Sequence, residues 1–170
     1  MSAVRLWLVR HGETDWSAAG RFTGWTDLSL NVTGRRQARS LHGYWDGVGF
    51  STVWSSDLRR SIETARLAGA PPPRLDRRLR ELDFGSIEGR TWDQLDPATQ
   101  AAMLAFDGFT ADGGESVAEL RERVLAFVDD LRAGDHLVFT HGGVIRLLAG
   151  DARGRHIGHG ELVRVDLRHP

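Results

Sequence analysis

Two histidines in matching sequence contexts are the residues of this chain best suited to chemistry. His11 follows the apolar run 6–9 and Arg10, while His141 follows the run 137–139 and a threonine. Short apolar runs of this kind are typical of buried strands. Because ligands bind at the carboxyl ends of strands in α/β sheets, we expect both histidines beside one ligand. Arg10 favours an anion as that ligand, because its planar guanidinium can hold two oxygens at once.

Phosphoryl transfer is the reaction that these side chains fit. Neutral His11 can attack phosphorus and carry the phosphoryl group as phosphohistidine. Arg10 and Arg60 can neutralise the phosphate oxygens, and His141 can donate a hydrogen bond to one of them. Arg59 is the alternative to Arg60, since only one of two adjacent arginines is expected to face the site. Because arginine and histidine supply the positive charge, we expect neither a metal ion nor another cofactor.

Glu81 is the candidate for proton transfer. It ends the segment 75–82, and its carboxyl group could give a proton to the leaving alcohol. The same group could then act as a base when water attacks phosphohistidine. The alternative is a surface ion pair, because Glu81 lies among Arg77, Arg78 and Arg80.

Strand and helix patterns alternate along the chain and would bring these residues together. Strands are predicted at 5–9, 50–54, 136–139 and 162–167, with a short extended segment within 75–82. Helices are predicted to follow N-terminal caps at Thr33, at 55–57 and at Ser116. Another helix is predicted at 144–149, and Thr91 begins a further capping box. This alternation predicts one domain over residues 1–170, of the α/β class, with three layers, α/β/α, and a mainly parallel sheet covered by helices on both faces. His11, Arg60, Glu81 and His141 would then meet at one edge of the sheet.

Composition excludes several classes of function. The chain has 170 residues, a net charge of −1 and no cysteine, and all 22 of its basic residues are arginine. Without cysteine and lysine there is no thiolate zinc site, cysteine nucleophile, Schiff base or P-loop lysine. The near-neutral charge and the lack of a long apolar segment predict a cytoplasmic protein that binds neither nucleic acid nor a membrane. The phosphoryl-transfer residues, and not the composition, predict a small phosphorylated metabolite as its partner. The oligomeric state stays open between a monomer and a homodimer.

Seven blocks of the chain resemble the histidine phosphatase superfamily, the group that includes cofactor-dependent phosphoglycerate mutase. They occur in family order at 10–14, 21–27, 30–34, 55–65, 79–89, 113–116 and 140–143. The resemblance implies a phosphoglycerate mutase-like fold and a nucleophilic His11. It also implies a phosphate pocket of Arg10, Arg60 and His141, with Glu81 as proton donor. Further phosphate-binding candidates within or beside these blocks are Ser17, Thr23, Gly24 and Gly142.

Departures from the mutase pattern favour the small phosphatase branch of this group. Mutases have asparagine at the position of Ser17, lysine at that of Trp92, and a longer insert before the second histidine motif. The chain looks most like the group of α-ribazole phosphatases. The resemblance therefore implies a metal-independent phosphomonoesterase, with α-ribazole 5′-phosphate as one candidate substrate. A phosphoglycerate mutase is the alternative.

Two other functions are weaker alternatives. A phosphate-binding scaffold without catalysis would not need the full set of candidate residues, and a zinc hydrolase would need carboxylates near the histidine motifs. The remaining histidines are interpreted as structural at 42 and 136 and as solvated at 156, 159 and 169.

Overall fold

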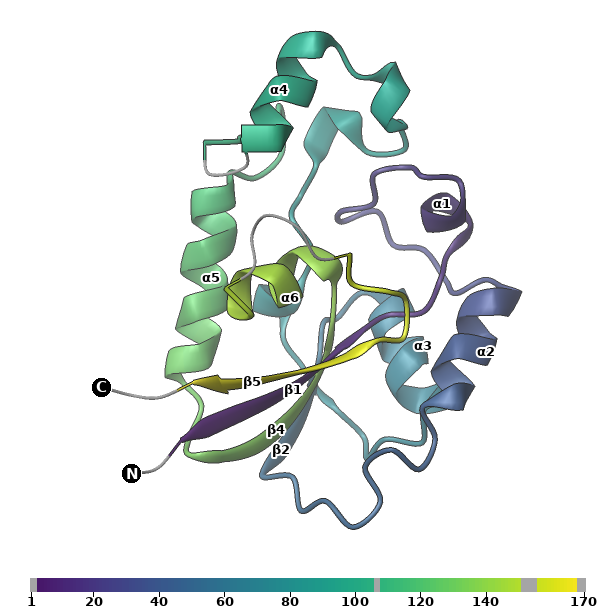
Figure 1. Ribbon diagram of the computed structural model, residues 1–170, viewed down its shortest axis with the longest axis vertical. Coiled ribbons are helices and arrows are strands. Elements are labelled where there is room, and N and C mark those ends of the chain that lie inside the picture. The colour runs from purple at the N-terminus through teal and green to yellow at the C-terminus, as the bar shows by residue number, and fades with distance from the viewer. Residues whose placement is uncertain (1–2, 106–107, 151–155, 168–170) are drawn as a thin grey trace.

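A five-stranded sheet forms the centre of the computed structural model, which describes residues 3–105, 108–150 and 156–167 (Figure 1). Its strands run in the spatial order β3-β2-β4-β1-β5. They span Val4–Arg10 (β1), Thr52–Ser55 (β2), Arg74–Leu75 (β3), Gly134–Thr140 (β4) and Leu162–Leu167 (β5). Four strands are parallel, and β5 pairs antiparallel with β1 at one edge. The predicted α/β class with a mainly parallel sheet is confirmed.

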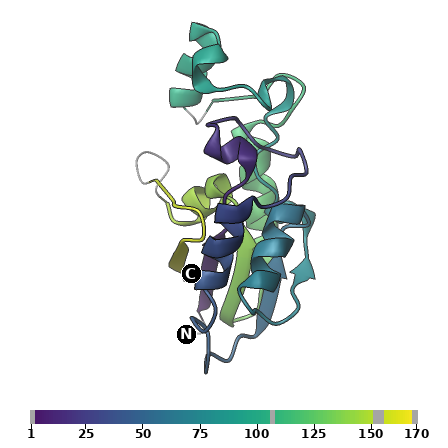
Figure 2. The same ribbon diagram turned by 90° about the vertical axis from the view of Figure 1, so that its right-hand side faces the viewer.

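Helices cover both faces of the sheet, which confirms the three-layer architecture (Figures 1 and 2). One face carries α2 (Val32–Ser40) and α3 (Arg59–Leu67), and the other carries α5 (Val117–Asp129) and α6 (Gly142–Leu148). Two further helices, α1 (Asp15–Ala18) and α4 (Pro97–Ala105), lie beyond the carboxyl ends of the central strands. Short 3₁₀ helices occur at Arg77–Leu79, Gly85–Ile87 and Trp92–Gln94. No helix in the described ranges is long and apolar enough to cross a bilayer.

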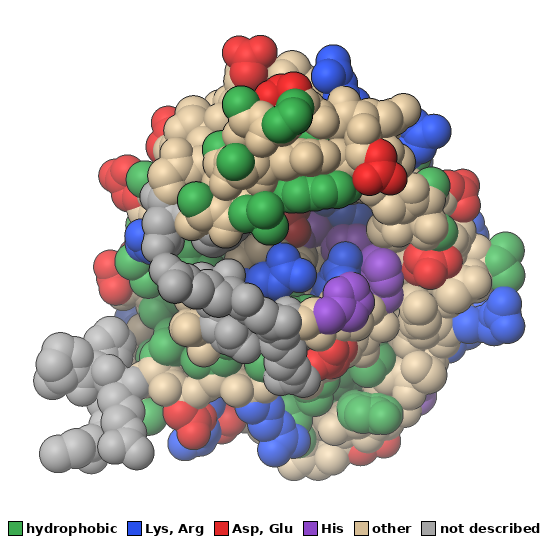
Figure 3. All heavy atoms as spheres, turned by 45° about the horizontal axis from the view of Figure 1, so that its top comes forward, with side chains coloured by type: hydrophobic (Ala, Val, Ile, Leu, Met, Phe, Trp, Pro, Cys, Tyr) green, Lys and Arg blue, Asp and Glu red, His purple; other side chains and the backbone are tan. Residues whose placement is uncertain are grey.

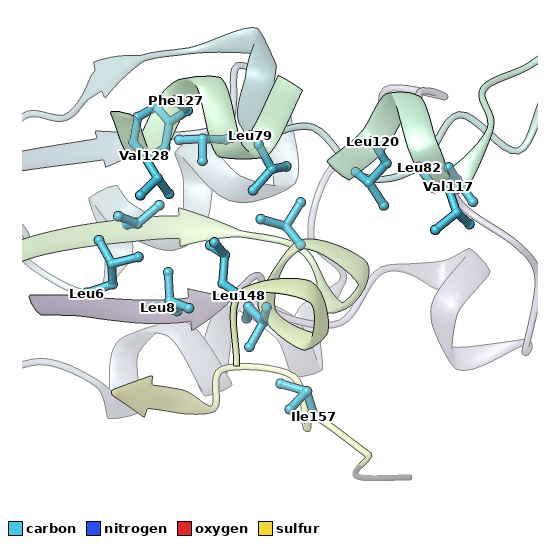
Figure 4. Close-up of a cluster of buried hydrophobic side chains, with 14 of the residues drawn as sticks. Leu6, Leu8, Leu79, Leu82, Val117, Leu120, Phe127, Val128, Leu148 and Ile157 are labelled. Atoms are coloured by element: carbon cyan, nitrogen blue, oxygen red, sulfur yellow. The ribbon is translucent and has the colours of Figure 1, made fainter. Parts of the chain in front are cut away.

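Side chains alternate along the central strands and so supply two hydrophobic clusters. Leu6 and Leu8 of β1 pack with the apolar faces of α5 and α6, as Figure 4 shows. Trp7 and Val9 point to the opposite face, where they pack with residues of α3 and with Trp45. Because β1 is covered on both sides, it appears in the sequence as a continuous apolar run rather than an alternating one.

Strand register brings the two histidine motifs together. Arg10, the last residue of β1, pairs with Thr140, the last residue of β4. His11 and His141 therefore follow directly after paired residues, at neighbouring positions on one edge of the sheet. The crevice at the carboxyl ends of parallel strands, where ligands bind in this class of fold, is thus lined by both imidazoles.

Two predicted helix starts are wrong, and the reasons differ. The cap of α2 is Asn31 rather than Thr33, because the Asn31 side chain accepts a hydrogen bond from Gly34 at 2.8 Å. The helix α3 begins at Arg59 without a side-chain cap on its N-cap residue. Asp57, predicted as part of a cap, instead forms an ion pair with Arg80. A neighbouring polar residue therefore provides the cap of α2, whereas at α3 a long-range ion pair engages the predicted capping side chain.

The segment 75–82 is extended over less of its length than predicted. Only Arg74 and Leu75 form a strand, and a 3₁₀ helix follows because the side chain of Asp76 accepts a hydrogen bond from the N–H of Arg78. Both predicted capping boxes, after Thr91 and Ser116, are present. The helix α4 was not predicted, although Asp96 caps its first turn by accepting a hydrogen bond from Thr99.

Candidate active site

His11 is held as one defined tautomer. Its Nδ1 lies 2.7 Å from the carbonyl oxygen of Gly12, which can only accept, so Nδ1 carries the proton. Its Nε2 lies 3.3 Å from Nε of Arg60, which can only donate, so Nε2 carries a lone pair. Gly12 makes this turn possible, because a Cβ there would overlap the backbone of Gly34. The arrangement leaves Nε2 as the nucleophilic nitrogen.

Arg60 is the member of the arginine pair that faces the site. It is fully buried, whereas Arg59 is exposed. Its two terminal nitrogens donate to the carbonyl oxygens of Gly24 at 2.7 Å and Thr26 at 3.0 Å. Burial lowers the pKa of Arg60 to about 10, against the opposing field of the Glu81 carboxylate. The guanidinium is therefore a charged group held rigidly beside the nucleophile.

His141 and Arg10 each have a buried nitrogen without a partner among the described residues, namely Nδ1 of His141 and Nε of Arg10. The rings of His11 and His141 lie with their centroids 5.1 Å apart. Nε2 of His141 is engaged by the hydroxyl of Ser56 at 2.9 Å. Since buried polar atoms almost always have partners, two unpaired nitrogens at one place indicate the position of a bound ligand.

Both histidines are neutral in this environment. Burial lowers the pKa of His11 well below its ordinary value, and the cations of Arg60 and Arg10 lower it further. Burial lowers the pKa of His141 in the same way, with Arg60 as the next largest cause. A neutral imidazole is the form that can attack phosphorus.

Glu81 belongs to the same cluster rather than to a surface ion pair. Its carboxylate accepts hydrogen bonds from the backbone N–H groups of Leu82 at 2.9 Å and Gly143 at 3.0 Å. It also opposes the effect of burial on the pKa of both Arg10 and Arg60, so it lies within electrostatic reach of these cations. The arginines that precede it at 78 and 80 form ion pairs with Asp76 and Asp57 instead.

Arg123 fixes the backbone that carries Glu81, and sequence reasoning missed it. Its guanidinium donates to the carbonyl oxygens of Arg78, Arg80 and Glu81 at 2.7–2.8 Å. It is itself held by an ion pair with Glu115 at 2.6 Å. Eight residues separate Glu115 from Arg123, so no helical pairing rule predicts this contact.

Glu88 has a comparable role in the loop that holds Arg60. Its carboxylate accepts hydrogen bonds from the backbone N–H groups of Trp25 at 2.7 Å and Thr26 at 2.9 Å. The Gly24 and Thr26 carbonyl groups are thereby directed at the Arg60 guanidinium. Glu88 stands in one of the blocks that resemble the family, but the residues alone did not indicate what it does.

The other four predicted phosphate-binding residues lie nearby and differ in what they contact. The hydroxyl of Ser17 is used in the capping box of α1 with Thr14, and that of Thr23 donates to the carbonyl oxygen of Arg21. Gly24 is buried and offers its carbonyl oxygen to Arg60. Gly142 is buried at the start of α6, against the Arg10 guanidinium. A direct contact between these residues and phosphate stays a prediction.

His159 lies beside the site and is only partly exposed, so the interpretation of it as a solvated loop residue holds only in part. Its ring centroid is 5.7 Å from that of His11, and its Nε2 is buried without a partner among the described residues. The loop before β5 places it there, because Gly160 donates to the carbonyl oxygen of Arg10, and Arg10 donates to that of Ile157. Burial and the cation of Arg10 lower the pKa of His159 to about 4. His169 lies outside the described residues.

The family model of the histidine phosphatase superfamily (branch 1) matches residues 6–169. The chain belongs to the histidine phosphatase superfamily. It is 38% identical over 160 residues to phosphoglycerate mutase-like protein 4 of Arabidopsis thaliana, covering 86% of this chain and 70% of that protein. It is also 38% identical over 145 residues to an acid phosphatase of Mycobacterium tuberculosis, covering 81% and 70% of the two chains. This member of the superfamily is therefore an enzyme, and its relatives bear both mutase and phosphatase names.

Solved structures agree with the fold of this histidine phosphatase. A phosphoglycerate mutase from Thermus thermophilus has a TM-score of 0.84 and 42% sequence identity, covering 98% of this chain and 99% of that one. The protein TTHB049 from the same organism has a TM-score of 0.85 and 44% identity over 95% and 92% of the two chains. Within the described part of the histidine phosphatase, no three histidine or acidic side chains are arranged to hold a metal ion.

Proposed function

We propose that this chain is a metal-independent phosphomonoesterase that acts through a phosphohistidine on His11. The observation that carries the proposal is the tautomer of His11, whose unprotonated Nε2 accepts a hydrogen bond from the Arg60 guanidinium. The unpaired nitrogens of Arg10 and His141 supply further contacts for phosphate oxygens. An acid phosphatase among the relatives supports the reaction class.

The first step breaks the ester bond. Nε2 of His11 attacks phosphorus, a nitrogen–phosphorus bond forms, and the bond to the ester oxygen breaks. Glu81 delivers a proton to the leaving oxygen, so the product is a neutral alcohol. Arg10 and Arg60 hold the phosphoryl oxygens throughout, and they stabilise the charge that spreads over these oxygens in the transition state.

The second step returns the enzyme to its starting state. Water attacks the phosphorus of phosphohistidine while ionised Glu81 takes one of its protons. Inorganic phosphate leaves, and Nε2 of His11 regains its lone pair. The hydrogen bond from Nδ1 to the carbonyl oxygen of Gly12 keeps the ring in the same orientation for the next cycle.

A phosphoglycerate mutase is the second candidate function, because several relatives bear that name. The two activities separate in one experiment. The purified protein is incubated with a panel of phosphorylated metabolites, including α-ribazole 5′-phosphate and 3-phosphoglycerate, in the presence of a chelator. Release of inorganic phosphate supports the phosphatase. Formation of 2-phosphoglycerate that depends on a bisphosphate primer, with no phosphate release, supports the mutase.

A further inference from the structure

An apolar cavity of about 200 Å³ adjoins the candidate active site and has no part in the steps described above. Glu81 and Gly143 are among the residues that line it, and these two residues share the hydrogen bond at the start of α6. The proton donor therefore stands between the phosphate pocket and the cavity. An ester oxygen that receives a proton from Glu81 has its organic group directed toward this space.

The walls of the cavity come from six separate parts of the chain, at residues 22, 81–84, 92, 103–109, 120 and 143–146. Phe22 and Phe84 form an aromatic pair with ring centroids 5.3 Å apart. Met103 of α4, the buried Leu120 of α5 and the partly exposed Trp92 complete the walls. Figure 3 shows the corresponding surface, where hydrophobic side chains border a hollow that contains arginine and histidine.

Charge is confined to the end of the cavity beside the phosphate pocket. The charged residues among its described lining are Glu81 and Arg146. Arg146 lowers the pKa of Arg10, so it too lies near the phosphate pocket. A hydroxyl or carboxylate group placed deeper in the cavity would meet only apolar side chains and would lose its hydrogen bonds to water.

The volume sets the size of the group that fits. An engineered apolar cavity of about 150 Å³ holds a benzene molecule, while sites for drug-sized ligands begin at roughly 300 Å³. A space of about 200 Å³ therefore suits one ring, or two fused rings, and not a larger multi-ring group.

We propose that this cavity binds the organic part of the substrate, and that the enzyme prefers phosphate monoesters of apolar, ring-bearing alcohols. The inference rests on the proposed phosphomonoesterase function. It goes beyond that function, because the phosphate pocket alone would accept any monoester.

The first test compares esters that release similar primary alcohols. Ethyl phosphate and 2-phenylethyl phosphate differ in the ring and little in the chemistry of the leaving oxygen. We expect kcat/KM to be about 10- to 100-fold higher for 2-phenylethyl phosphate, which is the effect of burying a side chain of phenylalanine size. Equal values, or higher values for 3-phosphoglycerate, would overturn the proposed substrate class.

The second test fills the cavity. Met103→Trp places a large ring in the space, while Leu104→Trp makes the same change at the next position of α4, which is 76% exposed and does not line the cavity. We expect Met103→Trp to reduce the ratio of kcat/KM for 2-phenylethyl phosphate to that for ethyl phosphate at least tenfold. Leu104→Trp should keep the preference, and circular dichroism should show both variants folded. Equal preference in the two variants would show that the cavity does not bind the ring.

A binding measurement separates failure of this inference from failure of the proposed function. The probes are 2-phenylethylphosphonate and ethylphosphonate, which cannot be hydrolysed, and their affinities are compared by calorimetry. Absence of turnover on every ester would contradict the proposed function. Under that outcome, tighter binding of 2-phenylethylphosphonate to the wild type than to Met103→Trp would still support the cavity assignment. Equal binding of the two phosphonates to the wild type would contradict the cavity assignment whatever the turnover.

Discussion

The carboxylate of Glu81 accepts a hydrogen bond from the backbone N–H of Gly143, at 3.0 Å, where α6 begins. Its other oxygen accepts from the N–H of Leu82. Two backbone donors, one of them far away along the chain, thus fix the position of the proposed proton donor. Each carboxyl oxygen still has a further lone pair with which to hold a proton or contact a leaving group.

Replacement of Glu81 by glutamine should slow hydrolysis most for esters with poor leaving groups. Aliphatic alcohols need a proton in the transition state, whereas p-nitrophenolate is a stable anion and needs it far less. We expect a loss of about 10²–10⁴-fold for alkyl phosphates. The burst of p-nitrophenolate in rapid mixing should persist, although steady-state turnover falls because dephosphorylation lacks its base. Equal loss in the burst phase of both substrate types would assign Glu81 a role other than proton donation.

Replacement of Gly143 by alanine should displace Glu81 without unfolding α6. A Cβ at this position would overlap the Glu81 carboxylate, although alanine favours a helix over glycine by about 1 kcal/mol. We expect kcat on alkyl phosphates to fall at least tenfold, with p-nitrophenyl phosphate less affected. Thermal unfolding provides the control, and a large drop in Tm would mean that the glycine is needed for folding and not for catalysis.

Replacement of His11 by alanine should abolish turnover, with a loss of about 10⁴-fold or more for a nucleophile. Wild-type protein exposed briefly to ³²P-labelled substrate should carry an alkali-stable, acid-labile label on the peptide that contains His11. The label should be absent from His11→Ala and present in His42→Ala, in which an exposed histidine is removed. Turnover by folded His11→Ala protein would exclude the phosphohistidine mechanism.

Chelation of metal ions should leave activity unchanged. The cations of Arg10 and Arg60 supply the positive charge that a metal ion provides in other phosphatases. The measurement is initial rate after prolonged incubation with EDTA, followed by dialysis. Loss of activity that returns with added zinc or magnesium would favour a metallohydrolase.

Stability should fall as pH decreases from about 6.5 to 4. The pKa of His159 is lowered to about 4, and those of His11 and His141 are lowered well below 6.5. Over this range the unfolded chain binds more protons than the folded chain, so the free energy of unfolding decreases with decreasing pH. Above pH 6.5 the three histidines make their full contribution to the free energy of unfolding.

His159→Gln tests the contribution of one residue to this pH dependence. The slope of unfolding free energy against pH should become shallower by at most about 1.4 kcal/mol per pH unit, the value for one proton. Urea unfolding at several pH values measures this slope. The difference in unfolding free energy between wild type and variant should be constant above pH 7. If that difference also stayed constant between pH 7 and 4, the lowered pKa of His159 would be contradicted.

The sequence alone was enough to locate the candidate nucleophile, the second histidine, Arg60 and Glu81. The signals of the two histidines are local, because each follows a short apolar run, whereas Arg60 and Glu81 were favoured over their alternatives by the family resemblance. The alternation of those elements was enough for the α/β class and the layer order. The capping boxes after Thr91 and Ser116 were predictable for the same reason, since all their contacts lie within one turn of chain.

Only the tertiary structure decided which residues support that site. Arg123 holds the Glu81 backbone from α5, Glu88 holds the loop that contacts Arg60, and His159 reaches His11 from the loop before β5. The apolar cavity likewise combines residues from six parts of the chain. These contacts join residues far apart in sequence, so they depend on strand register and helix packing. No local pattern carries that information, because the free energy that favours each contact exists only after the sheet has formed.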